Sequence, residues 1–189
     1  LPAPFAAAAL ILPRYSAHLI SHSSSPLVLP AFCVFSIARL VAFAPGTSWV
    51  TCGILFPIPR PTAMALARTQ GLPPEGILHA CLISVGAVLS GSVFGDHSSP
   101  ISDTTILSSA GGGCPHLEHV GTQIPYAIFV AVCAGAGIIV GGFTLNPWFA
   151  LLASAVLFFP GFFLLTKKDP EGNPKLSGMT WRKRKKEIE

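Results

Sequence analysis

Two aspartates and a histidine stand in a short polar stretch at the end of an apolar run. Asp96, His97 and Asp103 are accompanied by small hydroxyl side chains, namely Ser98, Ser99, Ser102, Thr104 and Thr105. Ionisable groups inside a membrane are costly and are functional candidates for that reason. Gly95 and Pro100 are expected to break the helix here, and a broken helix exposes carbonyl and amide groups that can bind an ion. The alternative interpretation is an aqueous loop.

The chemistry expected of this stretch is competition between a proton and a cation. Desolvation and a like-charged neighbour raise the pKa of a carboxyl group, so a proton can bind where a hard cation would otherwise sit. If Asp96 and Asp103 are held near each other, Na+ and H+ compete for one site, and a carrier loaded with either ion exchanges them. His97 would tune proton binding or relay protons, although a histidine beside an aspartate is as often a hydrogen-bond partner. Na+ and H+ are then transported substrates, and no catalytic group, cofactor or resident metal is expected.

A second polar stretch occupies residues 45–51 and contains Gly46, Thr47, Ser48 and Thr51. It suits the tip of a re-entrant hairpin that offers oxygen atoms to a cation, and the alternative is an ordinary turn between helices. Two interrupted apolar segments in one chain are the pattern that an inverted-repeat design predicts.

The elements that must position these residues are membrane helices. Of 189 residues, 51% are hydrophobic and 11% are charged, whereas a soluble domain carries roughly 25% charged residues. A bilayer-spanning helix needs about 20 apolar residues, and four runs approach that length, at residues 27–44, 77–94, 124–143 and 147–166. Residues 51–66 are apolar but broken by Pro57, Pro59 and Pro61, which predicts a kinked or re-entrant element. The sequence therefore predicts an all-α, polytopic helical bundle with interrupted helices.

The distribution of charge predicts three parts. Residues 1–26 form an N-terminal segment of unassigned structure with a truncated boundary, residues 27–166 a transmembrane domain, and residues 167–189 a basic tail. Lys and Arg near the end of a span face the cytoplasm, so we expect a multi-pass protein of the cell membrane, surrounded by lipid, with a cytoplasmic C-terminus. The basic tail lacks interleaved aromatic residues, so no nucleic-acid partner is expected. Gly137 and Gly141 predict close helix packing.

Residues 114–119 invite a metal-site interpretation through Cys114, His116, Glu118 and His119. The alternation of these residues with residues that cannot bind a metal does not fit the spacing of closed zinc sites, and a solvated loop is the simpler interpretation. A membrane metal-binding protein stays an alternative from a different functional class. Its ligands would be Asp96, His97, His116 and His119.

Several longer motifs can be compared with a known family. They are residues 46–49 (GTSW), 53–58 (GILFPI), 95–105 and 108–110 (SSA), followed by His116, His119-Val120, Thr122-Gln123 and Pro125-Tyr126-Ala127. Over roughly residues 32–163, the chain resembles the C-terminal half of the NhaC-type sodium/proton antiporters of the ion transporter superfamily. The departures from the family's usual residues are Pro45, Val50, Cys52, Ser98, Pro115 and the run of residues 59–61.

The resemblance implies a fragment of an inverted-repeat secondary transporter that exchanges sodium for protons. It carries over a set of cation-site residues and two oxygen donors at the hairpin tip: Asp96, Ser99, Ser102, Asp103 and Thr104, with Thr47 and Ser48 at the tip. The partners to expect are the missing N-terminal half and, as a candidate, a second copy of the chain. Relatives that exchange organic acids such as malate and lactate keep an organic-acid or amino-acid exchanger open as an alternative, beside an inactive fragment.

Overall fold

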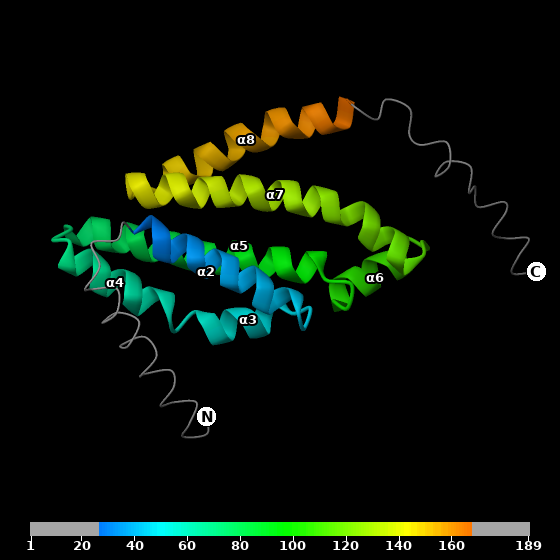
Figure 1. Cartoon of the computed structure of the whole chain (residues 1–189), viewed down its shortest axis with the longest axis horizontal. Helices are drawn as coiled ribbons and strands as arrows, with labels where there is room; N and C mark the ends of the chain where they lie inside the picture. Colours follow the sequence, from blue (N-terminus) through cyan, green and yellow to red (C-terminus); the bar gives the residue numbers. More distant parts are fainter. Residues whose placement is uncertain (1–26, 168–189) are drawn as a thin grey trace, which may run out of the picture. The chain divides into compact units, whose positions relative to one another are not determined.

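The computed structural model describes residues 27–167, with side chains as far as residue 163. Within this range the chain is helical, without strands (Figure 1). The helices are α2 (Val28–Phe43), α3 (Ser48–Leu55), α4 (Pro59–Thr69), α5 (Pro74–Ser98), α6 (Asp103–Gly111), α7 (His116–Thr144) and α8 (Pro147–Lys167). The all-α membrane fold is therefore confirmed. The predicted segment at residues 1–26 and the tail beyond residue 167 lie outside the described residues.

Two of these helices, α5 and α7, have 25 and 29 residues and are long and apolar enough to cross a membrane. The pair α3 and α4 would form a third span, bent by 41° at its break. Two further apolar helices are shorter, namely α2 with 16 residues and the part Pro147–Phe163 of α8.

The break between α3 and α4 falls at the prolines, as the sequence predicts. Pro57 has no N–H to continue the hydrogen bonds of α3, which ends at Leu55. Pro59 instead begins α4, because the first residue of a helix needs no N–H donor. The apolar run of residues 51–66 is therefore two helical pieces at an angle.

The break expected at Gly95 is wrong, because α5 continues through it to Ser98. Gly91 and Gly95 serve close packing instead. A Cβ atom at Gly91 would lie 2.5 Å from the Phe35 carbonyl oxygen of α2, and one at Gly95 would lie 2.6 Å from Ala42 Cβ. The helix ends before Pro100, since a proline disfavours helical geometry in the residue before it. Asp96 and His97 consequently lie in the last turn of α5, and not in a segment after it.

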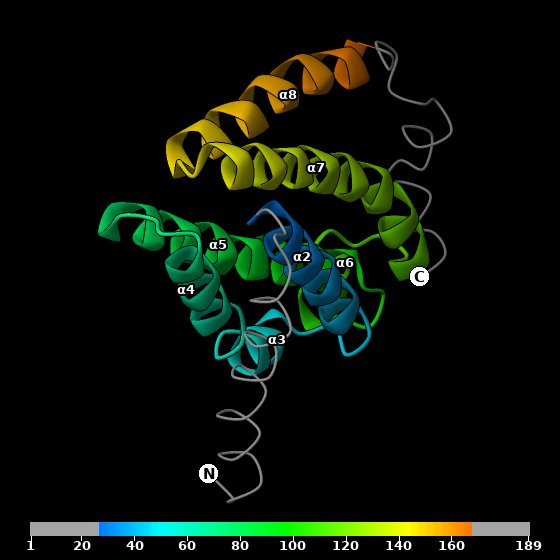
Figure 2. The same cartoon turned by 60° about the vertical axis from the view of Figure 1, so that its left-hand side comes forward.

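The core is built on the contact between α2 and α5. α7 packs against both of these helices (Figure 2). The buried residues of this contact are Ala31, Phe35, Ile83, Ala87, Ala131 and Ile138. A second cluster joins α2 and α5 to α3 through Ala38, Cys52, Leu55 and Val88. α5 is thereby held on two sides near the end that carries Asp96.

The chain divides into two compact units, Leu1–Ala155 and Val156–Glu189. In the first, Gly141 lies against Ala150, and a Cβ atom there would be 2.7 Å from Ala150 Cβ. The close packing predicted for Gly137 and Gly141 is thus confirmed. In the second, the described residues form the end of α8, where the rings of Phe158 and Phe162 stack at 5.8 Å.

Candidate functional site

Asp96 is a buried carboxylate, with 6% of its surface exposed. Ser48 Oγ, at the start of α3, donates a hydrogen bond to Asp96 Oδ2 at 2.9 Å. Ser102 Oγ, which precedes α6, donates to Asp96 Oδ1. Each carboxylate oxygen therefore accepts a hydrogen bond from a hydroxyl group, one at the break between α2 and α3 and the other at the break between α5 and α6.

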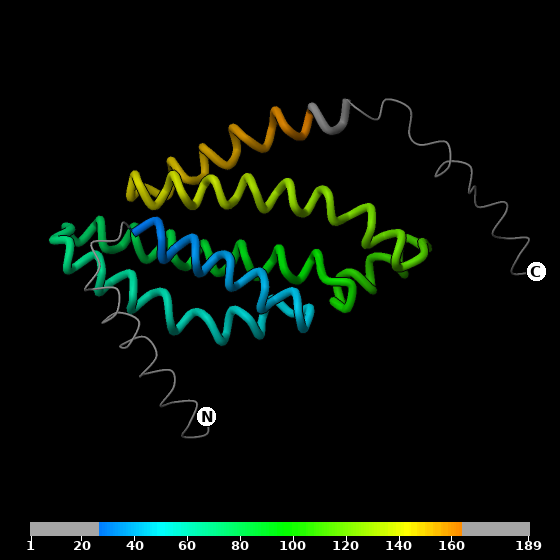
Figure 3. The backbone as a smooth tube through the Cα atoms, viewed as in Figure 1, coloured from blue at the N-terminus to red at the C-terminus, as the bar shows by residue number. Residues whose placement is uncertain are grey.

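The two interruptions lie directly against each other. The turn between α2 and α3 contains Gly46, whose φ of +67° is a left-handed value that favours glycine. A Cβ atom at Gly46 would lie 2.7 Å from Ser102 Cα and 2.8 Å from Ser102 N. Figure 3 shows this turn beside the link between α5 and α6. Gly46 thus permits the backbone contact that brings Ser48 to Asp96.

Ser102 extends the hydrogen-bonded group toward the surface. It is fully buried and is the N-cap of α6, accepting a hydrogen bond from Thr104 N at 3.3 Å. Ser102 Oγ and Thr104 Oγ1 lie 2.8 Å apart. Because a hydroxyl group has one proton and Ser102 gives its proton to Asp96, Thr104 must be the donor of this bond. The result is a chain of hydrogen bonds from exposed Thr104 through Ser102 to buried Asp96.

The other residues proposed from the sequence lie at varying distances from this group. Ser99 is fully buried in the link and accepts a hydrogen bond from Ile101 N at 3.4 Å. Thr47 Oγ1 is buried next to Ser48 and has no hydrogen-bond partner. Asp103 and His97 are exposed, one on the first turn of α6 and the other on α5. The structure therefore brings Ser48 and Ser102 onto Asp96, and does not bury Asp103 beside it.

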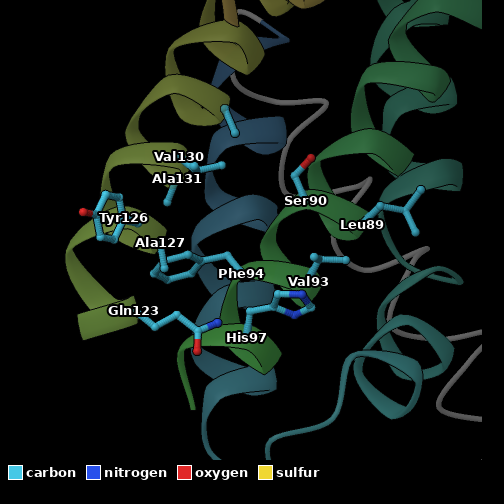
Figure 4. Close-up of a pocket in the computed structure, with 11 residues that line it drawn as sticks. Leu89, Ser90, Val93, Phe94, His97, Gln123, Tyr126, Ala127, Val130 and Ala131 are labelled. Atoms are coloured by element: carbon cyan, nitrogen blue, oxygen red, sulfur yellow. The ribbon is translucent and has the colours of Figure 1, made fainter. Parts of the chain in front are cut away.

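His97 lines a pocket between α5 and α7 with a volume of about 540 Å³. The lining is mostly apolar, and His97 and Gln123 lie at the same end of the pocket (Figure 4). Gln123 Oε1 is buried without a hydrogen-bond partner. The pocket has the size and the sparse polar groups of small-molecule sites.

Residues 116–119 are helical, so the loop expected there is wrong. They form the first turn of α7. His116 Nε2 donates to the Pro100 carbonyl oxygen at 2.6 Å, and His119 Nε2 lies 2.9 Å from Ser108 Oγ of α6. These contacts fix α7 to α6 and to the link after Asp96. In the part of the chain that the structure describes, no three His, Cys, Asp or Glu side chains are grouped as metal ligands, so the metal-binding alternative gains no geometric support.

Ser92 of α5 is fully buried, with 0% of its surface exposed, and the sequence does not single it out as a site residue. Thr51 of α3, which belongs to the second polar stretch, is equally buried. The available signal was spacing, because Ser92 precedes Asp96 by four residues and must share its helix face.

The chain matches a protein family and several individual proteins. An uncharacterized protein of Haemophilus influenzae is 41% identical over 155 residues, which are 82% of this chain and 28% of that protein. A malate-2H(+)/Na(+)-lactate antiporter of Bacillus subtilis is 32% identical over 111 residues, 56% of this chain and 21% of the relative. The arginine/ornithine antiporter ArcD of Halobacterium salinarum is 34% identical over 96 residues, 51% of this chain and 18% of the relative.

The chain therefore spans less than a third of the length of each of these relatives. No solved structure matches it. Residues 7–143 match the Na+/H+ antiporter family. Since this match covers most of the sequence, the chain belongs to the Na+/H+ antiporter family.

Proposed function

We propose that this chain supplies the ion-coupling site of a sodium/proton antiporter, in which Asp96 binds Na+ and H+ alternately. The observation that carries the proposal is the burial of this carboxylate where two helix interruptions meet, with hydroxyl groups from both on its oxygens. A buried charged carboxylate is costly without a counter-charge, so a cation and a proton compete to neutralise it.

The hydroxyl partners suit both loaded states, because a hydroxyl group can donate or accept a hydrogen bond. Toward a charged Asp96, Ser48 and Ser102 donate, as observed. When Asp96 carries a proton, its O–H donates to Ser102 Oγ, Ser102 donates to Thr104, and Thr104 turns its proton outward. The same side chains then hold either state without an unpaired polar group. The C-terminal end of α5, which bears Asp96, has the partial negative charge that favours a cation, whereas the N-terminal ends of α3 and α6 have the partial positive charge that favours the carboxylate.

The remaining assignments are part of the same proposal. Thr47, Ser99, Asp103 and Thr104 would act around the Asp96 site, and His97 would tune or relay protons. Because the curated relatives are more than three times as long as the matched part, transport would require the rest of such a protein. The assembly would lie in the cell membrane with a cytoplasmic C-terminus.

A second candidate is exchange of an organic substrate coupled to the same ions. The pocket of about 540 Å³ supports it, because His97 lies in that pocket and directly follows Asp96 in the chain. The relatives named for malate, lactate, arginine and ornithine exchange agree with such a role. The occupant would be a small molecule with a polar end at His97 and Gln123.

The test is sodium-driven proton movement in liposomes containing the full-length protein that the gene encodes. Asp96→Asn keeps the size of the side chain but removes the titrating charge, so exchange should fall to the level of empty liposomes. Asp96→Glu should retain measurable exchange. If Asp96→Asn exchanges sodium for protons at the normal rate, the proposal is wrong. If exchange occurs only after an organic acid or amino acid is added, the second candidate replaces the first.

A further inference from the structure

Ser92 is a buried hydroxyl group that the proposed function does not yet use. Its side chain has 0% exposure, and its Oγ has no hydrogen-bond partner in the described structure. Other serines on α5 satisfy their hydroxyl groups by donating to the carbonyl oxygen four residues earlier, as Ser84 does to Ala80 at 2.9 Å and Ser98 does to Phe94 at 2.6 Å. A buried hydroxyl group without such a bond is destabilising. In a native protein such a group calls for an explanation, of which a bound ion or water is one.

The helix spacing shows where Ser92 faces. Val88, Ser92 and Asp96 are separated by four residues each and share one face of α5. Val88 packs with Ala38 of α2 and with Cys52 and Leu55 of α3. Asp96 receives the hydrogen bond of Ser48, also on α3. Ser92 is therefore enclosed at the junction of three helices, one turn before the carboxylate.

A second unpartnered hydroxyl oxygen lies at the start of α3. Thr47 is the N-cap of α3, but its side chain makes no capping hydrogen bond, and its Oγ1 is buried without a partner. It directly precedes Ser48, which reaches Asp96. The adjacent Thr51 is fully buried, and its hydroxyl group is already used in a 2.9 Å bond to the Thr47 carbonyl oxygen. The start of α3 and the end of α5, which the hydrogen bond from Ser48 to Asp96 joins, thus carry one carboxylate and two buried hydroxyl oxygens without a partner.

We propose that Ser92 Oγ and Thr47 Oγ1 are ligands of the sodium ion that pairs with Asp96. A hard cation takes several oxygen ligands, whereas a proton needs only the carboxylate. The inference rests on the proposed antiport function, and it separates the two ions: Ser92 contributes to sodium binding and not to proton binding. Sodium enclosed by a charged oxygen and hydroxyl oxygens would satisfy the Ser92 and Thr47 oxygens, which are unpaired in the described structure.

The experiment compares Ser92→Ala with wild type in the full-length protein, using the sodium concentration for half-maximal exchange and the rise in unfolding temperature on adding NaCl. The half-saturating sodium concentration should increase about tenfold, the change expected from the loss of one polar contact. The rate at saturating sodium should be retained. The unfolding temperature without sodium should not fall, because alanine removes an unsatisfied hydroxyl group. Ser84→Ala is the matched control, being buried on the same helix face with a satisfied hydroxyl group, and should leave sodium dependence unchanged.

Ser92→Cys provides a second variant of nearly the same volume, and its soft sulfur is a poor ligand for a hard cation. It should also weaken sodium binding. Unchanged half-saturating sodium in both variants, alongside loss of sodium stabilisation in Asp96→Asn, would overturn the assignment of Ser92 and leave the proposed function intact. If Asp96→Asn also kept its sodium stabilisation, the failure would belong to the proposed function itself.

Discussion

Replacing Gly95 by alanine tests whether the contact of α2 with α5 positions the carboxylate. The added Cβ atom would lie 2.6 Å from Ala42 Cβ and 2.8 Å from Phe43 N, and would also meet the Arg39 carbonyl oxygen. Carbon atoms in ordinary contact are about 3.5–4.0 Å apart. The opposing atoms belong to the backbone or to a Cβ, so no flexible side chain can move aside. The last turn of α5 must therefore retreat from α2 by roughly 1 Å.

The magnitude follows from two opposing effects. Overpacking of a filled contact costs about 1–3 kcal/mol, while alanine is favoured over glycine within a helix by about 1 kcal/mol. The net loss of unfolding free energy should be about 0–2 kcal/mol. Gly86 is the matched control on the same helix, because a Cβ atom there would meet nothing within 4 Å. Gly86→Ala should stabilise the protein by up to about 1 kcal/mol.

The shift should also affect the ion site. Asp96 follows Gly95 directly, and its 2.9 Å hydrogen bond from Ser48 would be stretched beyond hydrogen-bonding distance by a movement of roughly 1 Å. Unfolding of the purified protein in detergent measures the stability, and sodium-driven exchange in liposomes measures the site. Equal stability and equal exchange for Gly95→Ala and Gly86→Ala would refute the close contact and the positioning that we derive from it.

Two further substitutions act on the helix interruptions. Gly46→Ala should lower the free energy of unfolding by about 1–2 kcal/mol for the left-handed backbone alone, and by more through its clash with Ser102. Sodium-driven exchange should fall sharply. An active Gly46→Ala protein would show that the turn need not touch the link between α5 and α6. Ser102→Ala removes the N-cap of α6 and a donor to Asp96, and should lower the free energy of unfolding by about 1 kcal/mol. Ser102→Thr, which keeps the hydroxyl group, should recover most of the exchange in the same liposome assay; equal loss in both variants would contradict the role given to that group.

The helices and one of their interruptions could be predicted because their causes are local. Apolar runs of nearly spanning length specify helices in a membrane, and Pro57 and Pro59 specify the break between α3 and α4 whatever surrounds them. The effect of Gly95 is not local. Glycine permits both a broken helix and a close helix contact, and only the position of α2 shows that the second applies. The polar residues 116–119 were misjudged for a similar reason, since their partners lie on α6 and in the link after α5.

The candidate site could be assigned to a stretch of sequence but not to one residue. Asp96 and Asp103 are equivalent by type, and both lie in the polar stretch that follows the apolar run of residues 77–94. Helix geometry separates them, because Asp96 shares a buried face with Val88 while Asp103 begins a new, exposed helix. The spacing of Ser92 puts it on the helix face of Asp96, but a lone serine in an apolar helix usually bonds to its own backbone, and only the structure shows that this bond is missing.

The interruption after α5 is a geometric requirement for the hydrogen bond between Ser102 and Asp96. In an unbroken helix, residues six apart are separated by about 9 Å along the axis and by roughly 240° around it, so their side chains cannot meet. The link after Ser98 folds the chain back and places Ser102 on the carboxylate, where the turn at Gly46 also rests. Exchange of sodium for a proton at Asp96 would therefore act on both interruptions at once, because each contributes one of its hydrogen bonds. A change in the angle between α2 and α3, or between α5 and α6, is the structural consequence that ion exchange at this carboxylate should produce.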